Sequence, residues 1–110
     1  MKVLHVFTLA TTAENFFDGQ FSYLSEAGYD LHLVASTDPS QDFCERNKVT
    51  FHKIDIARRV DLKADIGSIL ALRRLIKQEK LNAVVGHTPK GALVAMCAAR
   101  LSGVNTRIYY

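Results

Sequence analysis

Strand-like and helix-like patterns alternate along the whole chain. Apolar runs rich in β-branched residues occupy Lys2–Thr8, Asp30–Ala35, Val49–Ile54, Asn82–Gly86 and Asn105–Tyr110. Segments with helical periodicity lie between these runs, and such crossovers join parallel strands. The pattern therefore predicts an α/β fold, a Rossmann-like open parallel sheet with helices on both faces. Right-handed crossovers favour the strand order 3-2-1-4-5, which places the carboxyl ends of the first and fourth strands side by side.

The connecting segments predict four helices. They are expected from the turn at 9–12 to about residue 27, over 41–46, from residue 61 or 65 to near 80, and over 89–102. Thr11 and Glu14 have the spacing of a capping box at the start of the first helix. Gly28 and Gly103 follow helical segments as expected C-terminal stops.

Length and composition indicate one globular domain. The chain has 110 residues, 48% of them hydrophobic, and a formal net charge of +3. It contains two cysteines, too few for a disulfide framework, and lacks an apolar run long enough to span a bilayer. We therefore expect a cytoplasmic protein. Because the chain ends on Ile108-Tyr109-Tyr110, which still reads as strand, we also expect that residues 1–110 are a truncated domain of a larger protein.

The strongest candidate site is the turn after the fourth strand, Gly86-His87-Thr88-Pro89-Lys90. In an open parallel sheet, ligands bind at the carboxyl ends of the strands. Thr88 can cap the helix that follows, Pro89 suits its first position, and the exposed N–H groups there favour an anion. His87 and Lys90 would supply a titratable group and a cation at that position.

The other three histidines are expected to be structural. His5 and His32 lie in two strands that should pair, and buried imidazoles hydrogen-bonded to each other or to the backbone are the favoured interpretation. His52 lies in a strand expected near the sheet edge and is interpreted as solvated. Metal binding is the minority interpretation for these residues, and no cofactor is expected.

Several motifs are missing. The turn after the first strand reads Thr-Leu-Ala-Thr-Thr-Ala-Glu in place of the glycine-rich dinucleotide fingerprint, and no P-loop sequence occurs. The sequence also lacks a nucleophile elbow and a cluster with metal-ligand spacing. Basic residues are spread over several elements, so nucleic-acid binding is not expected.

Several blocks of the sequence resemble one family of enzymes. They are Phe16–Gln20 with Leu24, Ala27–His32, Asp61–Ala64, Asn82–Ala92 and Ala98–Val104. Together, in this order, they resemble the N-terminal part of glycosyltransferase family 4, in particular enzymes that build capsular and other cell-surface polysaccharides.

The resemblance implies a two-domain GT-B architecture with the active site in the cleft between two Rossmann-like domains. This chain would be part of the N-terminal, acceptor-side domain, and a missing C-terminal domain would hold the nucleotide-sugar donor. The implied reaction is transfer of a sugar, of the hexosyltransferase type, to a polysaccharide or lipid-linked acceptor. It would proceed with retention at the anomeric carbon and without a metal. The fragment alone is expected to be inactive.

The resemblance also assigns residues. The family often carries two histidines before Thr/Ser-Pro-Lys; His87 matches the second, and Val85 replaces the first. His87 is therefore the expected catalytic residue. The expected substrate-binding residues combine the hydroxyls of the two strand-end turns with the lysine: Thr8, Thr11, Thr12, Thr88 and Lys90.

Two further questions stay open at this stage. The basic residues Arg58, Arg59 and Lys63 would suit peripheral contact with the inner face of a membrane, although ordinary surface charge is the simpler interpretation. The alternatives to a transferase are a non-catalytic Rossmann-like binding domain and, less favoured because the glycine fingerprint is missing, a nucleotide-sugar epimerase or dehydrogenase domain.

Overall fold

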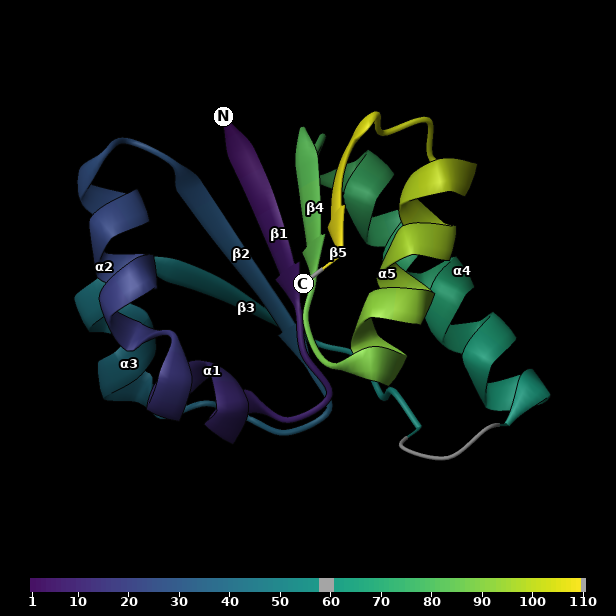
Figure 1. The fold of residues 1–110 in the computed structure, drawn as a ribbon, viewed down its shortest axis with the longest axis horizontal. Helices are drawn as coiled ribbons and strands as arrows, with labels where there is room; N and C mark the ends of the chain where they lie inside the picture. The colour runs from purple at the N-terminus through teal and green to yellow at the C-terminus, as the bar shows by residue number, and fades with distance from the viewer. Residues whose placement is uncertain (58–60, 110) are drawn as a thin grey trace.

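The computed structural model describes residues 1–57 and 61–109 and contains one five-stranded parallel sheet (Figure 1). The strands are β1 (Lys2–Val6), β2 (Asp30–Ala35), β3 (Val49–Lys53), β4 (Ala83–Gly86) and β5 (Thr106–Tyr109). Their order is β3-β2-β1-β4-β5, and each neighbouring pair is parallel. The predicted strand order is confirmed.

Helices cover both faces of the sheet (Figure 1). One face carries α1 (Ala10–Phe16), α2 (Asp18–Glu26) and α3 (Gln41–Asn47), and the other carries α4 (Leu62–Gln78) and α5 (Pro89–Leu101). The predicted doubly covered, Rossmann-like sheet is therefore confirmed. In the part of the chain that the structure describes, no helix is both long and apolar enough to cross a membrane.

Strand β1 supplies side chains to two separate cores. Alternate residues of a strand point to opposite faces, so Val3 packs on the α1–α3 side with Phe21. Leu4 and Val6 pack on the α4–α5 side with Leu72. Because β1 is buried on both faces and paired along both edges, it fixes the positions of β2 and β4.

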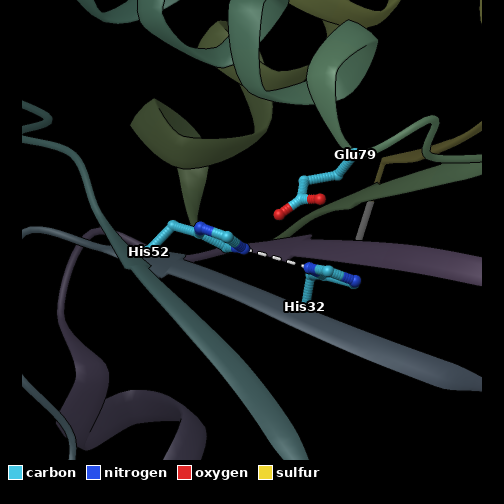
Figure 2. Close-up of side chains that lie close together, drawn as sticks. All are labelled: His32, His52 and Glu79. Atoms are coloured by element: carbon cyan, nitrogen blue, oxygen red, sulfur yellow. Dashed lines mark hydrogen bonds between the residues drawn. The ribbon is translucent and has the colours of Figure 1, made fainter.

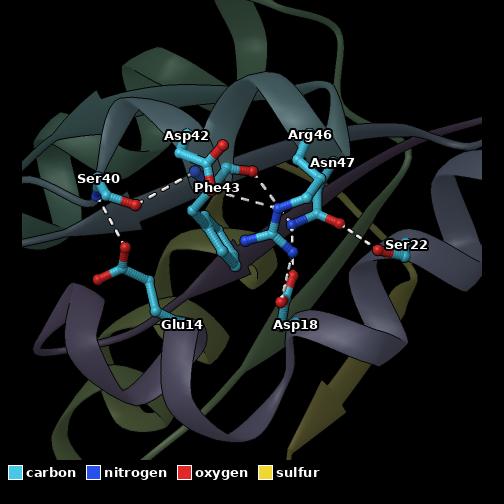
Figure 3. A network of polar contacts seen from close by, with 8 residues as sticks. All are labelled: Glu14, Asp18, Ser22, Ser40, Asp42, Phe43, Arg46 and Asn47. Atoms are coloured by element: carbon cyan, nitrogen blue, oxygen red, sulfur yellow. Dashed lines mark hydrogen bonds and ion pairs between the residues drawn. The ribbon is translucent and has the colours of Figure 1, made fainter.

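The first helical segment differs from the prediction. It consists of two helices, because Phe17 leaves the helical region (φ −126°, ψ 7°) and α2 starts again at Asp18. The Asp18 carboxylate accepts hydrogen bonds from Arg46 (2.6 Å) and Asn47 (2.7 Å) of α3 (Figure 3). This contact holds α2 against α3 and explains why the chain turns here.

The predicted capping box is also wrong. Helix α1 begins at Ala10, whose N–H donates to Thr37 Oγ1 at 2.9 Å, so Thr11 already lies inside the helix. Glu14 instead accepts a hydrogen bond from the N–H of Ser40 at 2.8 Å, at the start of α3 (Figure 3). A contact across 26 residues of sequence thus replaces the local one.

Close contact between β4 and α5 sets the turn between them. A Cβ atom added at Gly86 would lie 2.5 Å from the Cα atom of Ala92, which is fully buried. Glycine is therefore required here so that the first turns of α5 can rest on the end of β4.

We predict that Gly86→Ala lowers the free energy of unfolding by about 2 kcal/mol or more, because backbone must move to make room. Gly67→Ala is the matched control, since Gly67 lies in α4 with nothing within 4 Å of an added Cβ. That control should raise stability by about 0.5–1 kcal/mol through helix propensity. Urea unfolding of both variants tests this, and equal effects would contradict the close contact.

Candidate functional site

The turns after β1 and β4 enclose a pocket of about 440 Å³ at the carboxyl ends of the strands. It is lined by Thr8, Leu9, Thr12, Thr88, Pro89, Lys90 and Leu93. Strands β1 and β4 are neighbours, so residues about 80 positions apart in sequence meet here. Four of the five predicted substrate-binding residues line the pocket. The fifth, Thr11, is exposed and does not line it.

Two threonine hydroxyls join the turns across the pocket floor. Thr8 Oγ1 and Thr88 Oγ1 are 3.1 Å apart, and either can donate to the other. Thr88 occupies the N-cap position of α5, but its side chain makes no capping hydrogen bond. The predicted capping role of Thr88 is therefore wrong: the residue occupies the N-cap position, but its hydroxyl contacts Thr8 instead.

The backbone of Thr88 is strained. Its φ of 67° with ψ of 152° is a conformation that β-branched residues rarely adopt and that costs about 1–3 kcal/mol. Gly91 leaves room for the Thr88 side chain, because a Cβ atom added at Gly91 would lie only 3.1 Å from Thr88 Oγ1. Strain of this kind is concentrated at ligand-binding turns.

Lys90 reaches the pocket already engaged in an ion pair. Its Nζ lies 2.9 Å from Oδ2 of Asp65 in α4, and both side chains are largely buried. Asp65 Oδ1 is buried without a hydrogen-bond donor among the described residues. The carboxylate balances much of the lysine charge, so the pocket is a better match for a hydroxyl-rich ligand than for a free polyanion.

His87 lies behind the pocket and does not line it. The side chain is only 1% exposed, and Nε2 lies 3.0 Å from Nδ1 of His5. Its ring stacks on Phe7 with the centroids 4.1 Å apart. The expectation that this imidazole is aimed into the cleft does not match its position, because it points into the core beneath α1 and α2. A catalytic role for His87 stays a prediction.

Burial keeps this histidine pair neutral. Removal from water lowers the pKa of His87 to about 4. Burial, together with repulsion from His87, lowers the pKa of His5 to about 3. At neutral pH, His87 therefore positions the turn as an uncharged hydrogen-bonding ring.

The remaining histidines form a second pair. His5 and His32 are buried on paired strands, as predicted. A hydrogen bond between them, one of the two predicted alternatives, is wrong, because the β1–β2 register places His5 beside Leu33 and so on the opposite face from His32. His32 Nδ1 instead lies 3.0 Å from His52 Nε2. His52 is half-buried and contacts His32, so it is only partly solvated. Burial, together with repulsion from His32, lowers its pKa.

Asp65 is the main site residue that sequence reasoning missed. Its place in the sequence indicates only a helix start, and it lies 25 positions before Lys90 with no local pattern to join the two residues. Leu93 lies one turn of α5 beyond Pro89 and lines the pocket although it is 55% exposed. Helical spacing from Pro89 was the signal that would have found it. Arg58 and Arg59 lie outside the described residues.

A second hollow of about 480 Å³ lies at the amino end of β5 and includes Lys80, Asn82 and Thr106. Its volume is similar to that of the first pocket, so volume alone does not show which of the two binds a ligand. Topology does, because ligands of open parallel sheets bind at the carboxyl ends of the strands, where Thr8 and Thr88 meet.

The buried pair predicts a pH-dependent stability. Unfolded histidine has a pKa of about 6.5, above the values of about 4 for His87 and about 3 for His5. The unfolded chain therefore binds more protons below about pH 6.5, and stability falls as pH decreases, by up to about 1.4 kcal/mol per pH unit for each histidine. Urea unfolding between about pH 7 and 5 measures this slope. His87→Leu should flatten it, and an unchanged slope would contradict the neutral pair.

Known proteins share this fold and parts of this sequence. A UDP-Gal:alpha-D-GlcNAc-diphosphoundecaprenol alpha-1,3-galactosyltransferase of Escherichia coli is 29% identical over 86 residues, which are 77% of this chain and 22% of that protein. MurG of Acinetobacter baumannii superimposes with a TM-score of 0.71 at 22% identity, over 97% of this chain and 33% of that one. The lipopolysaccharide outer core galactosyltransferase WaaB gives 0.74 at 10% identity, over 98% and 32%.

The structural matches show a shared fold, and this chain spans about a fifth of the E. coli relative. A family model adds the sequence evidence. The model described as "Glycosyl transferase 4-like" matches residues 5–110, which include both strand-end turns and every residue that lines the pocket. The resemblance proposed from the sequence blocks is thereby confirmed at the level of the family: the chain belongs to the glycosyl transferase 4-like family.

Proposed function

We propose that this chain is the acceptor-side, N-terminal domain of a retaining glycosyltransferase that moves a hexosyl group from a nucleotide-sugar to a lipid-linked or polysaccharide acceptor. The observation that carries the proposal is the pocket in which the Thr8 and Thr88 hydroxyls meet at the carboxyl ends of β1 and β4. The membership of the chain in the glycosyl transferase 4-like family suggests the class of reaction, glycosyl transfer.

The chemistry of the pocket suits a sugar acceptor. A threonine hydroxyl can both donate and accept hydrogen bonds, so it can adapt to whichever sugar hydroxyl is presented. The N-terminus of α5 lies at the pocket, and a helix N-terminus favours a phosphate such as the one that links a sugar to its lipid. The Lys90–Asp65 pair keeps the remaining charge balanced.

In this proposal, the nucleotide-sugar donor binds to a second domain and not to this one. After β1, the first turn of α1 carries Thr11 and Thr12 where a dinucleotide fold has glycines, so the backbone cannot approach a diphosphate closely there. A second domain that continues the chain would hold the nucleotide-sugar, and the E. coli relative is several times longer than this chain.

The name of that relative suggests the substrates. It describes transfer from a uridine diphosphate sugar to a sugar linked through diphosphate to a polyprenol. We propose the same class of acceptor here, with the reaction on the cytoplasmic face of a membrane. Peripheral contact would use basic residues near the start of α4, where Lys63 is exposed.

His87 acts from behind the pocket in this account. Through its contacts with His5 and Phe7 it holds the 86–90 turn, and hence Thr88, in place. His87→Ala should then lower turnover at least about tenfold, and His5→Ala should lower it as well. Unchanged turnover in His5→Ala with a loss in His87→Ala would instead indicate direct contact of His87 with substrate.

Replacement of the pocket hydroxyl tests the proposal. In a protein that carries both domains, Thr88→Val should lower kcat/KM for a diphosphoprenol-linked sugar about tenfold or more, because a buried polar group of the ligand loses its partner. Thr11→Val is the matched control, since Thr11 is exposed and outside the pocket, and it should keep full activity. Equal activity of the two variants would place the acceptor elsewhere.

A further inference from the structure

A second cluster of titratable side chains lies apart from the pocket, on the α4–α5 side of the sheet (Figure 2). It combines His32 of β2, His52 of β3 and Glu79, the C-cap residue of α4. Each side chain offers one ligand atom, and the three atoms lie within 4.8 Å of one another. Figure 2 shows the Glu79 carboxylate directed toward the two rings.

We propose that His32, His52 and Glu79 bind a divalent transition-metal ion of the zinc class. Two imidazoles and a carboxylate form a ligand set that suits such ions. The two ring nitrogens that face each other, His32 Nδ1 and His52 Nε2, are 3.0 Å apart. With an ion about 2.1 Å from both nitrogens, the N–metal–N angle would be about 90°.

The third ligand needs only a small movement. Donor atoms around a tetrahedral zinc ion are about 3.4 Å apart. Because the three ligand atoms lie within 4.8 Å of one another, the Glu79 carboxylate must approach the rings by at most about 1.4 Å. Glu79 is half-buried at a helix end, where a flexible side chain can make this adjustment. The two histidines stand on paired strands and are held by the sheet, because the β2–β3 register fixes their spacing.

The surroundings of His32 support its role as a ligand. Its second ring nitrogen, Nε2, is buried and has no hydrogen-bond acceptor among the described residues. The Asp30 carboxylate lies 3.6 Å from it, close to hydrogen-bonding distance. A carboxylate behind a metal-bound histidine fixes the tautomer that leaves the opposite nitrogen, here Nδ1, available to the metal.

Some charges near the cluster favour a bound cation and others oppose it. The C-terminus of the long helix α4 carries partial negative charge, which favours a cation. Lys2 Nζ donates to the backbone carbonyl of Glu79 at 3.1 Å and adds a positive charge that opposes one. The two carboxylates, of the ligand Glu79 and of Asp30 behind His32, outnumber that lysine.

The site lies on the α4–α5 face of the sheet, and none of its three residues lines the Thr8–Thr88 pocket. A metal bound here would link β2 and β3, at the edge of the sheet, to the C-terminal end of α4. Its expected effect is therefore on stability, through preferential binding to the folded state, and the proposed transferase activity does not depend on it.

Calorimetric titration of the tag-free 110-residue chain with zinc chloride tests the proposal. We expect one site per chain, a raised melting temperature, and binding at least about tenfold weaker in both His52→Ala and Glu79→Gln. Glu26→Gln is the matched control, since Glu26 is an exposed carboxylate of α2 far from the cluster, and it should bind as the parent does.

Failure to bind zinc at near-millimolar concentration would overturn the proposal, as would binding that is unchanged in both ligand variants. The Glu79→Gln variant should fold like the parent chain, because Gln is isosteric with Glu and Glu79 lies at a helix end. Cobalt(II) offers a second measurement. A visible absorption band that appears with the parent chain and is lost in Glu79→Gln supports the site, and an identical band in both contradicts it.

Discussion

The parallel pairing of β1 with β4 is the constraint on which the site depends. These strands are separated by more than 75 residues, yet their register sets Val6 beside Gly86. The two following turns therefore leave the sheet at the same place, and Thr8 meets Thr88. The approach of Ala92 to Gly86 then fixes the direction of α5 and places its N-terminus at the pocket. Sheet pairing thus builds a ligand site from two turns that are distant in sequence.

Buried polar pairs support this framework without adding net charge to it. His5 and His87 share a hydrogen bond beneath α1 and α2, and Lys90 is balanced by Asp65 between α4 and α5. A charge isolated in either place would be costly, whereas a neutral or paired group is tolerated. The strained backbone of Thr88 is held between these two supports. This arrangement is typical of a turn shaped for a ligand at some cost in stability.

The fold could be predicted because each strand and helix carries its own local pattern, and right-handed crossovers leave few orders for five strands. The location of the pocket followed from the same topology. Side-chain partners did not follow. Sequence gives no register, so it could not show that His5 faces away from His32, and it could not join Asp65 to Lys90. The break at Phe17 depended on a tertiary contact between α2 and α3, which local propensity does not contain.

The central claim is that the acceptor binds where the two threonine turns meet. The most direct measurement is a two-dimensional amide NMR titration of this chain with a short-chain prenyl-diphosphate-linked N-acetylglucosamine. The account predicts saturable shifts of the amide signals of Thr8, Thr12 and Thr88 to Lys90. Shifts confined to the hollow around Lys80 and Asn82, at the other end of the sheet, would contradict it.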